Sequence, residues 1–222
     1  MKLSAELAYR TIDLVYAESG LKAVVCDTDG MIIAAVEKDR IGTVHSGACR
    51  ILQEGVEEVT ATPEEETLSG GMVRSGVHLP IKIGQAVVGT YGIGGEPSMV
   101  RSIARISVGL IREDLHKQQI RRQMQEQDRR FQTLFASMNE GVALHEVVVD
   151  EAGVPQNYRI VEVNRSYERN VGLQKEAVCG KLANEAYGTP EPPFFEKFAA
   201  VGITGVADSL DAFFEPLNKY FS

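Results

Sequence analysis

The chain has 222 residues, of which 44% are hydrophobic and 24% charged, and its net charge is −8. This composition is typical of a globular protein with one or two domains and excludes a disordered chain. No apolar run reaches the roughly 20 residues of a membrane helix, and the N-terminus lacks a signal-peptide pattern, so we expect a cytoplasmic protein without a membrane partner. Three widely spaced cysteines, Cys26, Cys49 and Cys179, form neither a disulfide framework nor a zinc motif.

Charge is distributed unevenly along the chain. Residues 1–98 carry 8 basic and 14 acidic side chains, residues 99–131 carry 8 basic and 4 acidic, and residues 132–222 carry 7 basic and 13 acidic. Two acidic lobes therefore flank a short basic connector, which is either a solvated helix face or a minor phosphate contact. Because nucleic-acid binding needs an extended basic surface, we expect no direct binding of nucleic acid by this chain.

The first lobe is predicted to alternate helices with antiparallel hairpins. Gly and Asp-Thr-Asp-Gly sequences mark its turns, and β-branched runs mark its strands. In chain order we expect a helix that contains Leu7 to Val15 and ends at Ser19-Gly20, a hairpin of Leu21–Cys26 and Met31–Ala35, a helix over Val44–Gly55, and a hairpin of Val77–Ile83 and Ala86–Ile93. This order predicts an α+β sensor lobe with one sheet and surrounding helices.

A long helix is predicted to follow the first lobe. Between Ser98 and Met138 the chain has one glycine, Gly109, and no proline. Most positions spaced alternately three and four residues apart are apolar there, as in a parallel coiled coil, so we expect a homodimer. We call these positions the heptad stripe: Ile103, Ile106, Leu110, Glu113, Lys117, Ile120, Met124, Gln127, Phe131, Leu134 and Met138. The alternative is an amphipathic helix that packs on its own domain, at least as far as Leu115.

Polar residues on the loops of the first lobe form a candidate ligand site: Arg40, Thr43, His45, Ser46, Arg74, Ser75 and His78. Guanidinium groups pair bidentately with carboxylates, so two arginines beside two histidines favour a small carboxylate effector. The alternative for each residue is a plain surface arginine or a helix-capping histidine. Since neither a Ser-His-Asp or Cys-His motif nor a phosphate-loop lysine is present, we expect no enzyme activity, no cofactor and no metal.

Three sequence blocks resemble the sugar diacid recognition domain of bacterial carbohydrate diacid regulators. The blocks are Arg40–Ala48, Gly76–Ile81 and Val88–Pro97, and the resemblance extends from residue 3 to about residue 115. It implies effector contacts at Arg40, Ile41, Gly42, His45, Arg74, Gly76 and Pro80. Ser46 and His78 stand where that family usually has an acid and an asparagine. Both are expected to line the pocket, so the ligand need not be glucarate, galactarate or glycerate.

The second lobe resembles a PAS domain of bacterial signalling proteins. Residues 131–142 predict a helix and then a strand that begins at a glycine, with strands over His145–Val149 and Tyr158–Val163. Asn164 is expected to cap the next short helix, because its side chain can accept a free N–H. The residues from Phe213 to Ser222 supply only a strand-turn-strand start, so we expect a PAS domain that is incomplete at its C-terminus.

Two further features of the second lobe invite a cofactor interpretation. His145 is the one histidine of this lobe, and Phe194, Phe195 and Phe198 recur at helical spacing. We interpret His145 as an ordinary hairpin histidine and the phenylalanines as core residues. No cofactor is therefore expected here either.

Together these patterns predict an α+β protein with two sensor lobes that contain antiparallel sheets (PAS/GAF-like), joined by a long coiled-coil helix. The expected boundaries are 1–112 for the diacid-recognition-like lobe, 113–131 for the helical linker and 132–222 for the PAS lobe. The predicted function is a cytoplasmic signal-transduction input module that binds a small carboxylate and relays binding to an output domain outside the chain. The alternatives are an enzyme acting on a carboxylated substrate and a dimerising scaffold without a ligand.

Overall fold

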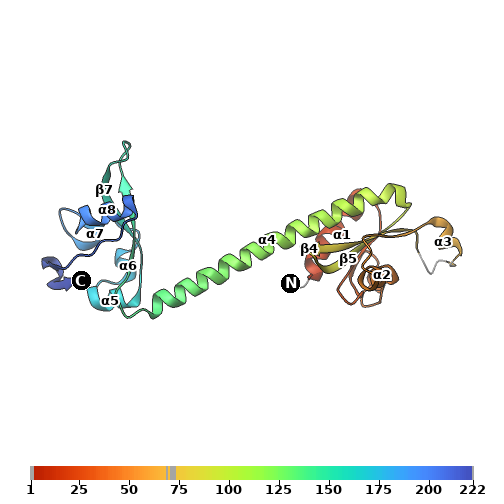
Figure 1. Cartoon of the computed structure of the whole chain (residues 1–222), viewed down its shortest axis with the longest axis horizontal. Helices are drawn as coiled ribbons and strands as arrows, with labels where there is room; N and C mark the ends of the chain where they lie inside the picture. The colour runs from red at the N-terminus through yellow and green to blue at the C-terminus, as the bar shows by residue number, and fades with distance from the viewer. Residues whose placement is uncertain (1–2, 69, 71–73, 222) are drawn as a thin grey trace. The chain divides into compact units, whose positions relative to one another are not determined.

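The structure is a computed structural model that describes residues 3–68, 70 and 74–221. The chain divides into two compact units, Met1–Met124 and Gln125–Ser222 (Figure 1). Among the described residues, no helix combines the length and the apolar character needed to cross a membrane. Each unit is mixed helix and antiparallel sheet, as the sequence predicts.

Unit 1 is built on a five-stranded antiparallel sheet with the strand order β2-β1-β5-β4-β3. Both predicted hairpins are confirmed, and they pair with each other through β1 and β5. The strands are β1 (Ala23–Cys26), β2 (Ile32–Ala35), β3 (Val59–Ala61), β4 (Gly76–Ile83) and β5 (Ala86–Gly94). Strand β3, which the sequence analysis did not predict, adds to the outer edge of β4.

Capping residues mark the start of α1 and the ends of α1 and α2. Helix α1 starts after Ser4, whose hydroxyl accepts the N–H of Leu7, and stops at Gly20 in the left-handed conformation. Gly55 ends α2 in the same way. The helices are α1 (Ala5–Ser19), the 3-10 turn η1 (Lys38–Arg40), α2 (Ser46–Glu54) and α3 (Pro63–Leu68), of which η1 and α3 were not predicted.

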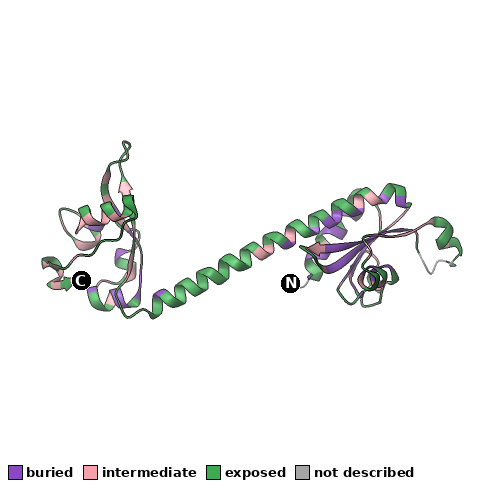
Figure 2. Cartoon of the chain, viewed as in Figure 1, coloured by how far each residue is buried: buried purple, intermediate pink, exposed green. Residues whose placement is uncertain are grey.

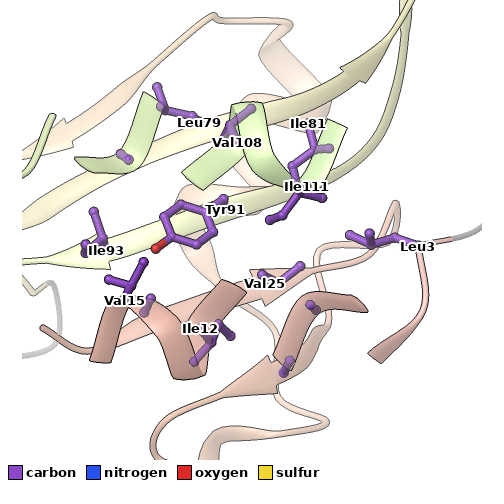
Figure 3. Packing of buried hydrophobic residues seen from close by; sticks show 14 of the residues in the cluster. Leu3, Ile12, Val15, Val25, Leu79, Ile81, Tyr91, Ile93, Val108 and Ile111 are labelled. Atoms are coloured by element: carbon purple, nitrogen blue, oxygen red, sulfur yellow. The ribbon is translucent and has the colours of Figure 1, made fainter. Parts of the chain in front are cut away.

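Alternation along the strands gives the sheet two different faces. One face packs on α1 and on the start of α4, and Figure 3 shows Tyr91 amid Ile12, Val25 and Val108 in this core. Strands point successive side chains to opposite faces, so His78, between Val77 and Leu79 of this core, lies on the face that carries α2. A smaller cluster on that second face contains Val24, Cys26, Ile32, Ala35 and Ala48.

Helix α4 (Pro97–Ser137) has 41 residues and continues from unit 1 into unit 2. Its first half packs on the sheet, but through residues beside the heptad stripe: Val100, Ala104, Val108, Ile111 and Leu115. Two stripe residues on the same stretch, Ile106 and Leu110, remain exposed. Beyond Leu115 the helix and its stripe residues are mostly exposed (green in Figure 2), whereas Ile103, the first stripe residue, is partly buried against the core. The long helix is therefore confirmed, whereas the coiled coil stays a prediction.

Unit 2 contains two separate hairpins with short helices between them. Strands β6 (Ala143–Val149) and β7 (Pro155–Val163) pair with each other, as do β8 (Ala212–Phe214) and β9 (Lys219–Phe221). Asn164 caps the helix that follows β7, accepting the N–H of Tyr167 at 2.8 Å, as predicted. The helices are α5 (Arg165–Val171), α6 (Lys175–Val178), α7 (Ala183–Tyr187), α8 (Phe195–Thr204) and the 3-10 turn η2 (Glu215–Leu217).

Candidate functional site

A hydrogen-bonded loop between β2 and α2 holds Arg40 and His45. The Arg40 carbonyl accepts both the N–H and the hydroxyl of Thr43, at 3.1 and 2.6 Å. Gly42 adopts a φ of 81°, which glycine tolerates, and donates its N–H to Ile32 of β2. The N–H of His45 is bonded to the carbonyl of Gly30. The backbone therefore fixes where both side chains leave the loop.

His45 stacks on His78, and we call these two residues the histidine pair. The ring centroids are 4.6 Å apart with an interplanar angle of 30°. Two glycines make room for the rings: a Cβ on Gly47 would lie 3.3 Å from the His45 ring, and one on Gly92 would lie 2.3 Å from Nδ1 of His78. His78 is only 4% exposed, and its Nε2 lies 2.8 Å from the hydroxyl of Thr90 on β5.

Burial keeps the histidine pair neutral. Burial, with a smaller contribution from the Arg40 guanidinium, lowers the pKa of His45 to about 4. Burial also holds the pKa of His78 well below its usual range, with smaller contributions from His45 and Arg40. Among the described residues, Nδ1 of His45 is buried and has no hydrogen-bond partner. A buried polar atom without a partner is costly, so this nitrogen is suited to a ligand group.

Polar groups continue below the histidine pair into the sheet. The hydroxyl of Thr90 contacts both His78 and the thiol of Cys26, and Thr90 and Cys26 are fully buried. Burial raises the pKa of Cys26 to about 12, so this thiol is protonated and unreactive at neutral pH.

Arg40 and Arg74 meet at one carboxylate, that of Glu37. Its Oε2 lies 2.5 Å from Nη1 of Arg74 and 3.9 Å from Nη1 of Arg40, and its Oε1 lies 2.8 Å from Nζ of Lys22. The hydrogen bond from Lys22, followed by that from Arg74, lowers the pKa of the Glu37 carboxyl. We call Lys22, Arg40 and Arg74 the cation cluster.

The other predicted site residues lie around these groups. Ser46 is the exposed first residue of α2, and Ile41 is also exposed on the loop. His45 occupies the capping position of α2, but its side chain makes no capping hydrogen bond. Pro80 and Gly76 lie in β4, opposite Thr90 and Gly94.

Two of the remaining positions have mainly structural roles. A Cβ on Gly76 would meet the carbonyl oxygen of Ile93 at 2.2 Å, so this close strand pairing requires glycine. Ser75 donates its N–H to the Glu66 carboxylate. Sequence reasoning missed Lys22, Glu37 and Thr90, although the Thr90 block was part of the resemblance.

A cavity of about 850 Å³ lies wholly within unit 2. Its walls include aromatic rings from β7, α5, α7 and α8, among them Tyr158, Tyr167 and Phe198. His145 lies in this wall with its ring against Tyr158 and Phe198, and its buried Nε2 has no partner among the described residues. Burial lowers the pKa of His145 to about 4. The cavity contains none of the predicted site residues.

Residues 3–138 match the sequence profile of the sugar diacid recognition family. Uncharacterized protein YsfB of Bacillus subtilis (strain 168) is 29% identical over 123 residues, which make up 54% of this chain and 33% of YsfB. The Carbohydrate diacid regulator of Escherichia coli (strain K12) is 29% identical over 105 residues, or 47% of this chain and 26% of the regulator. The matches therefore span a third or less of these relatives.

The fold also resembles a solved structure. The crystal structure of the E. coli DhaR(N)-DhaL complex aligns with a TM-score of 0.52 at 14% identity, covering 81% of this chain and 67% of that one. At this identity the likeness concerns the fold alone. The profile match covers more than half of the 222 residues, including Arg40, the histidine pair and Arg74. The chain therefore belongs to the sugar diacid recognition family.

Proposed function

We propose that the chain is a sensory input module whose unit 1 binds a small dicarboxylate or hydroxycarboxylate through Arg40, His45 and Arg74. The observation that carries this proposal is the buried, unpartnered Nδ1 of His45 beside the Arg40 guanidinium. A ligand carboxylate would accept from both groups and so satisfy a nitrogen that the protein leaves without a partner. Membership of the sugar diacid recognition family supports a sugar diacid or a related acid as the effector.

The chemistry of the site favours binding over catalysis. A general base works best when its pKa is near the operating pH, but burial holds the pKa values of both histidines far below neutrality. The nearby thiol of Cys26 has a raised pKa and is fully buried, so it is a poor nucleophile. Arg40 and Arg74 would supply charge and geometry, which a receptor needs.

Isothermal titration calorimetry on the full chain tests the proposal. D-glucarate, galactarate and glycerate should be compared, and at least one should bind. Arg40→Gln and Arg74→Ala should each weaken binding of the diacids D-glucarate and galactarate by about 1.5–3 kcal/mol, because each removes a charge-assisted hydrogen bond. Arg50→Gln is the matched control, since Arg50 pairs with Glu54 on the exposed side of α2. Unchanged affinity in both test variants would contradict the residue assignment.

Binding would reach the rest of the protein through β5 and α4. Thr90, which contacts His78, lies on β5, and β5 ends at Gly94, just before α4 begins at Pro97. A parallel homodimer through the heptad stripe would carry the change along α4 to unit 2, interpreted as a PAS lobe. The output would be a histidine kinase, a diguanylate cyclase or a transcription regulator outside the chain.

The exposed heptad stripe also favours a second candidate, a dimerising scaffold that binds no ligand. Met124 and Leu134 are 61% and 67% exposed, which is unusual for large apolar side chains unless another surface covers them. A thermal-shift screen of sugar diacids and hydroxy acids separates the two candidates. A shift of several degrees with one acid supports the sensor, and no shift with any anion supports the scaffold.

A further inference from the structure

The cation cluster is already occupied by an anion that belongs to the protein. The carboxylate of Glu37 contacts Lys22 and Arg74 at hydrogen-bonding distance, and these partners are 15 and 37 residues away in the sequence. The Glu37 side chain is 22% exposed, whereas those of Lys22 and Arg74 are 57% and 53% exposed. The carboxylate is thus less exposed than the two cations that contact it, which come from different segments of the chain.

The three cations are not held equally. Arg40 lies 3.9 Å from Glu37, beyond hydrogen-bond distance, and it also acts on the pKa values of the histidine pair. Arg40 and His45 are therefore available to a first ligand carboxylate while Glu37 stays in place. Arg74 and Lys22 are committed to Glu37, so a second ligand carboxylate can reach them only by replacing it.

We infer that Glu37 stands in for the second carboxylate of a diacid in the free protein, and that only a ligand with two carboxylates displaces it. This inference rests on the proposed function, because it concerns the same carboxylate site. A monoacid would bind at Arg40 and His45 and leave the Glu37 contacts intact. A diacid would take Arg74 from Glu37, and Arg74 directly precedes the segment that leads into β4 and His78. Only a diacid would therefore change the contacts of Arg74, and with them the segment that leads into the sheet.

Replacing the carboxylate of Glu37 by the isosteric amide tests the exchange. D-glucarate and D-gluconate are suitable probes, because they share a carbon chain and differ in one carboxylate. In calorimetry, Glu37→Gln should bind D-glucarate about tenfold more tightly than the unmodified chain, and D-gluconate less than twofold more tightly. Asp39→Asn removes the same charge two residues away, and we expect it to change both affinities by less than twofold.

Lys22→Met provides an independent variant should Glu37→Gln fold poorly. It should weaken D-glucarate about fivefold and leave D-gluconate unchanged, because Lys22 would serve only the second carboxylate. Equal or weaker D-glucarate binding in Glu37→Gln would show that Glu37 positions the arginines, and would overturn the inference. Equal tightening in Glu37→Gln and Asp39→Asn would reduce the effect to general charge and also overturn it. If the unmodified chain binds no carboxylate, both the proposed function and the inference fail. If it binds D-glucarate but Glu37→Gln does not tighten that binding, only the inference fails.

Discussion

The imidazole of His45 rests on that of His78, with ring centroids 4.6 Å apart. One ring comes from the loop before α2 and the other from the central part of β4. The loop that carries His45 is thereby joined to the sheet through two buried neutral rings. Because neither ring is charged in the free protein, an anion that approaches His45 changes the electrostatics of the whole histidine pair.

The first prediction is that anion binding takes up a proton. In the free protein the pKa of His45 is about 4, so the ring is neutral at pH 6. A carboxylate against Nδ1 favours the charged imidazolium and raises that pKa, so affinity should rise as the pH falls from 8 towards 5. Calorimetry at pH 6 in two buffers of different ionisation enthalpy measures the proton count. His45→Gln should abolish the uptake, and zero uptake in the unmodified chain would contradict the prediction.

The second prediction concerns the acid stability of unit 2. His145 has a pKa of about 4 when folded and 6.5 when unfolded, so the unfolded chain binds the proton more readily between these values. Its contribution to stability is therefore present above pH 6.5 and is lost as the pH falls towards 4. Urea unfolding at pH 7 and pH 4.5 should show a loss about 2 kcal/mol smaller in His145→Gln than in the unmodified chain. An equal loss of stability in both proteins would show that protonation of His145 does not cause it.

The third prediction contrasts two glycines. A Cβ at Gly92 would lie 2.3 Å from the His78 ring, so Gly92→Ala should push that ring aside, destabilising unit 1 by about 1–3 kcal/mol and weakening acid binding. A Cβ at Gly109, within α4, meets nothing within 4 Å. Gly109→Ala should therefore stabilise the helix by about 0.5–1 kcal/mol. Urea unfolding of both variants checks the opposite signs.

Much of unit 1 could be predicted because the residues that end its helices and form its turns act locally. Gly20 and Gly55 end helices in the left-handed conformation, and the Asp27–Gly30 turn closes a hairpin, so neighbouring residues suffice to place these elements. Strand β3 was missed because three residues offer too little alternation. Helix α3 was missed because it buries no residue and therefore shows no apolar periodicity.

The candidate site was predictable only in part, because some of its contacts are local and others join distant segments of the chain. Arg40 and His45 share one loop, so their proximity follows from the sequence. Alternation along β4 also places His78 on the face opposite Val77 and Leu79. The contacts of Glu37 with Lys22 and Arg74 join segments that only the folded sheet brings together. The spacing of apolar residues along the sequence does not predict such contacts.

The fourth prediction is that residues of the heptad stripe hold two copies of the chain together. Light scattering at tens of micromolar should give twice the monomer mass of 24.3 kDa. Ile120→Asp should return the mass to that of the monomer, because it places a charge in a desolvated seam. Gln125→Asp is the matched control, since heptad spacing places position 125 on the opposite side of the helix. A monomer mass for the unmodified chain would exclude the dimer.

The last prediction is that ligand binding changes the register or tilt of α4 in the dimer and does not unfold unit 2. The joint before the helix is permissive, since β5 ends at Gly94 and the next residue, Gly95, adopts a φ of 138° two residues before Pro97. Glu113, Lys117 and Gln127 interrupt the stripe and weaken the seam, so we expect two registers of similar free energy. A ligand with modest differential affinity can bias them.

Spin labels on the outer side of α4, at Arg122→Cys and at Ala136→Cys, measure this change in a chain that also carries Cys49→Ser and Cys179→Ser. Cys26 can stay, because it is fully buried and its pKa is about 12, which leaves it protonated and unreactive. Adding D-glucarate should shift the distance distribution across the dimer at both positions, since a stiff helix without internal glycine beyond Gly109 moves as one lever. If calorimetry shows binding while both distributions stay fixed, α4 does not transmit the signal as a lever.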